Sequence, residues 1–130
     1  MASGNTQRLP PEIGRVEDTK VEKPWGYELR WAITDRYAGK VLHVNRGEAL
    51  SLQYHERKDE YQYVLRGAVD VELGGADGRL TTRRMRAGDT LHITPGTRHR
   101  ITAVEDADII EVSTPEIDDV VRLEDRYGRA

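Results

Sequence analysis

Residues 47–67 have the sequence GEALSLQYHERKDEYQYVLRG, and the interpretation of the chain starts from them. Residues 50–55 alternate strictly between apolar and polar side chains, and Gln53 and His55 share the polar face. This period of two predicts a β-strand. After a short charged turn, a second alternating segment begins at Glu60. The stretch therefore predicts two adjacent strands that carry three side chains with metal-binding atoms.

The rest of the chain shows the same kind of pattern. Roughly ten short segments have strand periodicity, turn residues separate them at intervals of about 8–12 residues, and none has a sustained helical period. This pattern predicts an all-β sandwich or barrel. The expected strands cover 27–31, 40–44, 50–55, 60–65, 68–73, 79–86, 90–93, 98–104, 107–113 and 118–123.

Length and composition predict one folded domain with a polar extension. The 130 residues are 37% hydrophobic and 33% charged, which suits a single small core under a charged surface. Residues 1–20 are polar and contain Pro10 and Pro11, so we expect a flexible N-terminal arm. Residues 21–130 are expected to form the domain.

The net charge and the absence of cysteine argue against several kinds of partner and site. The net charge of −3 gives no electrostatic reason to expect nucleic acid or an anionic membrane as partner. No apolar run approaches the ~20 residues of a membrane helix, and the N-terminus lacks the apolar core of a signal peptide. The absence of cysteine excludes disulfides and thiolate ligands, and it fits a cytoplasmic location.

Four side chains are candidates for one metal site. Gln53 and His55 lie two residues apart on one strand face, and a tight turn places Glu60 opposite them. His99 ends a second segment, 88–99 (GDTLHITPGTRH), which only a closed barrel or sandwich would bring near. Two imidazoles, a carboxylate and an amide oxygen suit a divalent transition metal such as Zn, Mn, Fe, Co or Ni better than Ca or Mg.

The spacing of these two segments resembles the two motifs of the cupin superfamily. The first motif matches with Gln53 where histidine is usual, and the second matches with its proline one place late. The resemblance implies a jelly-roll barrel, the cupin-type double-stranded β-helix. The residues that carry it are Gly47, Gln53, His55, Glu60 and Gly67 for the first motif, and Gly88, Pro95, Gly96 and His99 for the second.

A narrower resemblance is to the cupin domain of type II mannose-6-phosphate isomerases. It rests on the segments KPWGY (23–27), LSLQ (50–53), GTRHR (96–100), DDVVR (118–122) and EDRYGR (124–129). That family binds its metal, commonly zinc, through Gln, His, Glu and His. The resemblance therefore implies Gln53, His55, Glu60 and His99 as ligands and an aldose–ketose isomerisation of a sugar phosphate through an enediol.

Three further residues have expected roles in that reaction. Lys40 matches a lysine of the family and is expected to bind substrate or transfer a proton. Arg100 and Arg122 are candidates for binding phosphate, because a guanidinium group can do so through two hydrogen bonds. Tyr61 and Tyr63 alternate with Glu60 and should face away from the metal, in the core or in the homodimer interface that we expect.

Two other function classes stay open at this point. One is a different metal-dependent cupin enzyme, such as an iron dioxygenase or a lyase. Gln53 disfavours the dioxygenase, because an amide oxygen is a weaker donor than an imidazole. The other is a non-catalytic module that binds a sugar or a small acid. Fold alone does not separate these classes.

Overall fold

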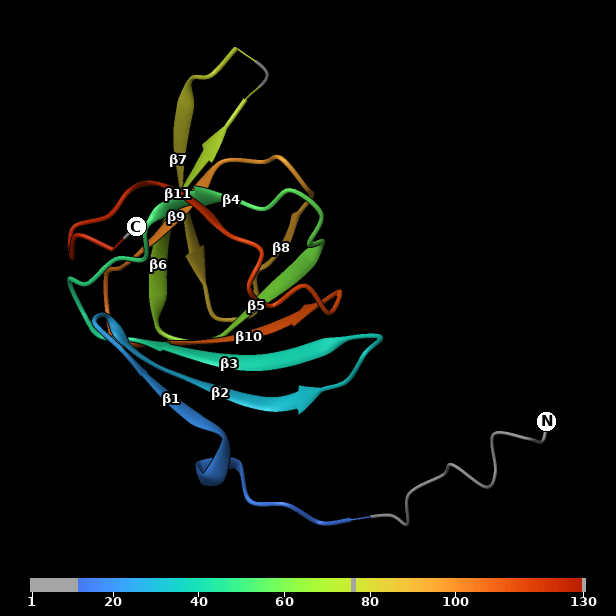
Figure 1. Cartoon of the computed structure of the whole chain (residues 1–130). Coiled ribbons are helices and arrows are strands. Elements are labelled where there is room, and N and C mark those ends of the chain that lie inside the picture. The colour runs from blue at the N-terminus through green and yellow to red at the C-terminus, as the bar shows by residue number, and fades with distance from the viewer. Residues whose placement is uncertain (1–11, 76, 130) are drawn as a thin grey trace.

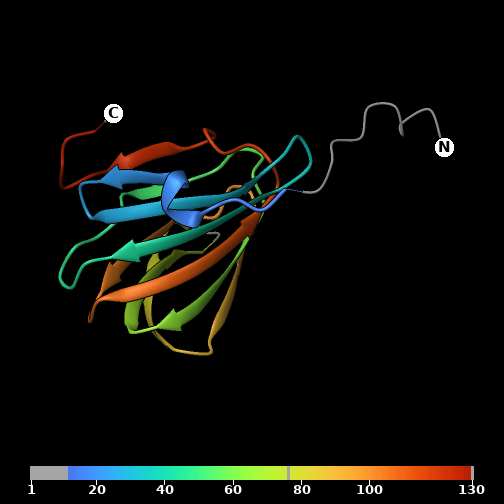
Figure 2. The ribbon, with the colours of Figure 1, turned by 90° about the horizontal axis from the view of Figure 1, so that it is seen from below.

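The computed structural model describes residues 12–75 and 77–129, which form two antiparallel sheets facing each other (Figure 1). The first sheet contains, in spatial order, β1 (Lys20–Lys23), β2 (Gly26–Ile33), β3 (Ala38–Val44), β10 (Ala107–Ser113), β5 (Glu60–Arg66) and β8 (Thr90–Ile93). The second contains β11 (Val121–Glu124), β4 (Leu52–Tyr54), β9 (His99–Ala103), β6 (Ala68–Gly74) and β7 (Leu80–Arg86). Figure 2 shows β2, β3 and β10 side by side in one layer.

The predicted strands recur with small shifts of their ends. Six of them lie within β2, β3, β5, β6, β8 and β10 at the expected residues. The strand predicted over 50–55 is shorter, because β4 covers only Leu52–Tyr54, and the last strand begins at Val121 rather than at 118. The sequence interpretation missed β1, which pairs with β2 across the turn that contains Pro24.

The crossing of the chain from β5 in the first sheet to β6 in the second is made by a single glycine. Gly67 lies between β5 and β6 with a φ of 83°. A Cβ atom at this position would overlap the backbone carbonyl oxygen of Asp106. A non-glycine residue would therefore be strained both by its backbone conformation and by this contact.

The interior has an apolar end and a polar end. On β10 the inward-facing residues change from Ala107 and Ile109 to Glu111, and on β9 they change from Ile101 to His99. Because neighbouring strands keep register, the polar residues of different strands collect at one end. The apolar end is made by Trp25, Leu42, Val44, Val64, Val69, Val71, Met85, Ile101, Ala103, Ala107 and Ile109.

The region predicted as an arm extends only partly into the described residues. Residues 1–11 lie outside them, whereas Val16–Thr19 form a 3₁₀ turn, η2, that contacts β2. Within the described ranges, no helix has the length and hydrophobicity that crossing a bilayer would require.

Candidate functional site

Three buried side chains meet between the two sheets at the polar end. His55 directly follows β4, Glu60 opens β5 and His99 opens β9. Their candidate ligand atoms all lie within 4.8 Å of one another. Because β5 belongs to one sheet and β4 and β9 to the other, long-range strand pairing assembles the cluster.

Both histidine rings are oriented by backbone oxygens. Nδ1 of His55 lies 2.6 Å from the carbonyl oxygen of Asp119, and Nδ1 of His99 lies 2.9 Å from that of Thr97. A carbonyl oxygen only accepts hydrogen bonds, so each Nδ1 carries a proton, and in the neutral form of the ring each Nε2 presents a lone pair. Metal-binding histidines in proteins have this arrangement.

The atoms that face each other in the cluster are both acceptors when His55 is neutral. Nε2 of His55 lies 2.7 Å from Oε1 of Glu60. Apart from each other, neither atom has a hydrogen-bond partner in the described part of the chain. A lone pair and a carboxylate oxygen this close repel unless a cation offsets the charge, and the ammonium group of Lys58, 3.7 Å from Glu60 Oε1, contacts the carboxylate alone. The donor set therefore fits a bound metal ion, with two nitrogen ligands and one oxygen ligand.

The protonation states also suit ligation. Burial alone would raise the pKa of Glu60, but the contact with His55 and the charge of Lys58 outweigh it and hold that pKa well below its usual range. The other carboxylate oxygen of Glu60 accepts a hydrogen bond of 2.9 Å from Gln62. Burial lowers the pKa of His99. The site thus favours an ionised carboxylate and a neutral imidazole, which are the forms that bind metals.

Gln53 lies beside this cluster. It is directly opposite His99 in the ladder between β4 and β9, and it lines the cavity next to His55. Its Oε1 accepts a hydrogen bond of 2.6 Å from Ser51 Oγ. An amide oxygen has a second lone pair, so this bond leaves it able to act as a donor to a metal. Its role as fourth ligand stays a prediction.

Lys58 joins the cluster to a second buried carboxylate. Its Nζ lies 3.7 Å from Glu60 Oε1 and 3.2 Å from Glu111 Oε2. Burial raises the pKa of Glu111 to about 7, and the negative charge of Glu60 adds to this effect. Burial favours the neutral amine of Lys58, but the two carboxylates outweigh it and raise its pKa. Lys58 is therefore the buried counter-ion of both acids.

A similar group surrounds Glu28. Its Oε1 accepts a hydrogen bond of 2.6 Å from Arg30 Nε and lies 3.4 Å from Lys40 Nζ. Both Glu28 and Lys40 are buried. Burial would raise the pKa of Glu28, but the charge of Lys40 and the bond from Arg30 lower it. The ammonium group of Lys40 is thereby held in place inside the barrel.

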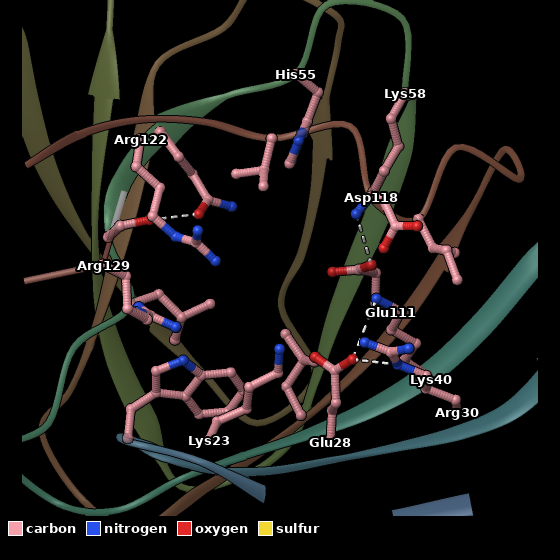
Figure 3. A pocket seen from close by; sticks show the side chains of 17 residues that line it. Lys23, Glu28, Arg30, Lys40, His55, Lys58, Glu111, Asp118, Arg122 and Arg129 are labelled. Carbon is pink, nitrogen blue, oxygen red and sulfur yellow. Dashed lines mark hydrogen bonds and ion pairs between the residues drawn. The ribbon is translucent and has the colours of Figure 1, made fainter. Parts of the chain in front are cut away.

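A cavity of about 310 Å³ opens beside these groups (Figure 3). Cations outnumber acids in its lining, so it suits a polar, anionic small molecule better than an apolar one. The ionisable residues that line it are Lys23, Glu28, Arg30, Lys40, His55, Lys58, Glu111, Asp118, Arg122 and Arg129.

Two of the three residues predicted to act on the substrate lie in this cavity. Lys40 and Arg122 line it, whereas Arg100 does not. Arg100 alternates with His99 along β9 and faces the other side of the sheet. There it forms hydrogen bonds of 2.7 and 3.0 Å with Glu72 and one of 3.2 Å with Glu124. The structure thus does not bring Arg100 to the site.

The sequence interpretation missed several residues of the cavity. Glu111 had a signal, because it lies two positions from Ile109 on the inward face of β10. Lys58 had none, since it lies in a charged turn that predicts exposure. Glu28 was missed because its neighbours on β2 are apolar and were expected to face inward. In the structure that apolar face points outward, and Trp31 is half exposed.

Comparison with known proteins places this site in a family context. A family model described as the cupin domain matches residues 40–113. This range spans β3 to β10 and includes all three residues of the cluster.

Curated relatives match most of the chain. Mannose-1-phosphate guanylyltransferase from Escherichia coli (strain K12) is 34% identical over 115 residues, which are 85% of this chain and 23% of that protein. Xanthan biosynthesis protein XanB from Xanthomonas campestris is 33% identical over 124 residues, which are 89% of this chain and 26% of that protein. The chain thus spans about a quarter of the length of these relatives.

Solved structures share the architecture. KdgF from Halomonas sp. is 30% identical with a TM-score of 0.66, over 74% of this chain and 85% of that one. Oxalate decarboxylase from Bacillus subtilis has a TM-score of 0.72 at 20% identity, over 88% of this chain and 33% of that one, and this likeness concerns the fold alone. The predicted all-β jelly-roll barrel is confirmed.

Proposed function

Because the chain belongs to the cupin family, we propose that it is a metal-dependent isomerase of a sugar phosphate, with mannose 6-phosphate as the first substrate to test. The observation that carries this proposal is the buried cluster of His55, Glu60 and His99 beside a cation-rich cavity. The names of relatives that act on mannose 1-phosphate support a sugar phosphate as ligand. We place the reaction in the cytoplasm, which suits a chain without cysteine.

The cluster is the proposed holder of the metal. A divalent ion, with zinc first and manganese, iron, cobalt or nickel as alternatives, would supply Lewis-acid polarisation of the sugar oxygens. His55, Glu60 and His99 would bind it, with Gln53 as the predicted fourth donor. The three side chains are buried, which strengthens the electrostatic effect of the charges in the cluster.

A coupled assay tests the function. Protein loaded with zinc, and in parallel with manganese or cobalt, is mixed with mannose 6-phosphate, and fructose 6-phosphate is measured. We expect turnover that a chelator abolishes and that added metal restores. Metal-loaded protein without turnover in either direction would refute the isomerase. Dioxygen consumption with Fe(II) in that case would instead indicate the dioxygenase class.

Lys40 is the proposed hydrogen-bond and proton donor to the sugar oxygens. Lys40→Met should lower kcat/KM by about 10²–10⁴-fold, the range for a lost acid–base group. Metal content should not change, because Lys40 is not in the metal cluster. The fold should also persist, since Glu28 keeps its bond from Arg30. Activity within about twofold of wild type would contradict this role.

We further propose that the protein is a homodimer through the outer face of the first sheet. Large apolar side chains are exposed there on β2, β10 and β5, with Trp31 50%, Val112 48%, Tyr61 50% and Tyr63 41% accessible. Register places Val112 beside Tyr61. An apolar patch of this kind marks an interface in soluble proteins.

Charges placed in this patch test the dimer. The double variant Tyr63→Lys with Val112→Lys should be monomeric in light scattering coupled to size exclusion, whereas wild type elutes as a dimer. The reason is that two like charges per subunit would be buried at the interface. A monomeric wild type, or a variant that stays dimeric, would refute this interface. Arg84→Glu, on the other sheet, is the control.

A further inference from the structure

Three cations from separate parts of the chain line one region of the cavity. Lys23 ends β1, Arg122 lies on β11 and Arg129 lies in the C-terminal segment. Figure 3 shows Arg122 and Arg129 along one wall and Lys23 beneath them, away from Lys58 on the facing wall. We call these three residues the cation trio.

The cations of the facing wall have acidic partners, whereas Lys23 has none. Lys40 and Arg30 share Glu28, and Lys58 lies between two carboxylates. Lys23 forms no ion pair with any residue in the described ranges. Burial lowers the pKa of Lys23 and outweighs the attraction of Glu28, and nearby cations lower it further. A bound anion would offset this unfavourable accumulation of positive charge.

Arg129 is oriented for such a ligand. Its Nε and Nη2 donate hydrogen bonds of 3.0 and 2.8 Å to the two carboxylate oxygens of Asp125. The Asp125 side chain is only 3% exposed, so it holds the guanidinium group rigidly. This paired contact uses one edge of the group and leaves Nη1 for a further acceptor.

We propose that Lys23, Arg122 and Arg129 form a subsite for a phosphoryl group, with the rest of the substrate extending toward His55 and Gln53. A dianion with three acceptor oxygens offers one oxygen to each cation, and its charge balances that of the three cations once the pairing of Arg129 with Asp125 is counted. Only the identity of the substrate as a sugar phosphate rests on the proposed function. The binding of phosphate itself follows from the cation trio.

Inorganic phosphate is the probe that separates these two claims. Its affinity for the metal-loaded protein is measured by calorimetry at constant ionic strength, which removes general screening effects. Lys23→Met should weaken phosphate binding about tenfold or more, as expected for a lost hydrogen bond between charged groups. Arg122→Lys keeps the charge but loses the two-pronged contact, and it should weaken binding about threefold to tenfold.

Lys20→Met is the matched control. Lys20 lies on the same strand, exposed and paired with Glu22, and its loss should change phosphate affinity less than about twofold. Wild-type affinity in both Lys23→Met and Arg122→Lys, or no phosphate binding to wild type at millimolar concentration, would overturn the subsite. If the Lys23→Met loss is found but mannose 6-phosphate is never turned over, the subsite stands and the isomerase proposal fails.

Discussion

His99→Ala is expected to purify with little or no bound metal and to lose more than ~100-fold of its activity on mannose 6-phosphate. Removing even a residue that only supports a metal ligand costs about 10–100-fold in affinity or activity, and loss of a ligand itself should cost more. The remaining donors, His55, Glu60 and the predicted Gln53, would provide one nitrogen and two oxygens, a weaker set for a divalent transition metal than one with two imidazoles. Elemental analysis of the purified variant and the coupled assay measure both effects.

His92→Ala is the control for this substitution. His92 is also a histidine at a strand of the barrel, but it is exposed, bonded to Asp59 and stacked on Tyr61. The variant should keep wild-type metal content and activity. If His99→Ala retained metal at full stoichiometry, the proposed set of ligands would be wrong.

Lys58→Met is expected to lower the free energy of unfolding by about 3 kcal/mol, as breaking a buried ion pair does. The side chains of Lys58, Glu60 and Glu111 are only 7%, 1% and 5% exposed, so water cannot replace the lost ammonium group. The cost should fall at the lower end of the range for such pairs, because Glu111 can take up a proton. Chemical denaturation of the metal-loaded proteins measures the difference.

Two further variants test whether the loss of stability in Lys58→Met comes from the broken buried ion pairs. Arg84→Met removes an arginine from an exposed pair with Asp70 and should leave the free energy of unfolding close to that of wild type. Adding Glu111→Gln to Lys58→Met should recover part of the loss, because it removes a carboxylate that has lost its partner. A Lys58→Met protein as stable as wild type would show that Lys58 is not the counter-ion of these acids.

The fold was predictable because its strands alternate in composition. The same alternation placed Gln53 and His55 on one face, and this part of the site follows from local sequence. Glu60 was expected opposite His55 on a paired strand, whereas β4 and β5 lie in different sheets. His99 is far from Glu60 along the chain, because β6, β7 and β8 lie between their strands. Its place in the site depended on the spacing of the second motif, since no local pattern specifies which distant strands pair.

The residues that the sequence-based prediction misplaced or missed have physical reasons in common. Arg100 was expected in the site, yet the alternation that turns His99 inward must turn its neighbour outward. Glu28 and Glu111 were overlooked because buried charges contradict the usual partition of polar residues to the surface. Such residues persist inside only with partners, and the partners here are Lys40, on β3, and Lys58, in the turn before β5. The interior of the barrel is therefore determined by pairs that sequence periodicity alone does not reveal.

X-ray absorption at the zinc edge of zinc-loaded protein tests most directly whether His55, Glu60 and His99 bind a metal. One zinc per chain is expected, with scattering from two imidazole rings and nitrogen and oxygen ligands at about 2.0–2.2 Å. His99→Ala should lose this spectrum. Zinc bound at much less than one ion per chain, or a spectrum without imidazole scattering, would contradict the proposed metal site and the isomerase mechanism that depends on it.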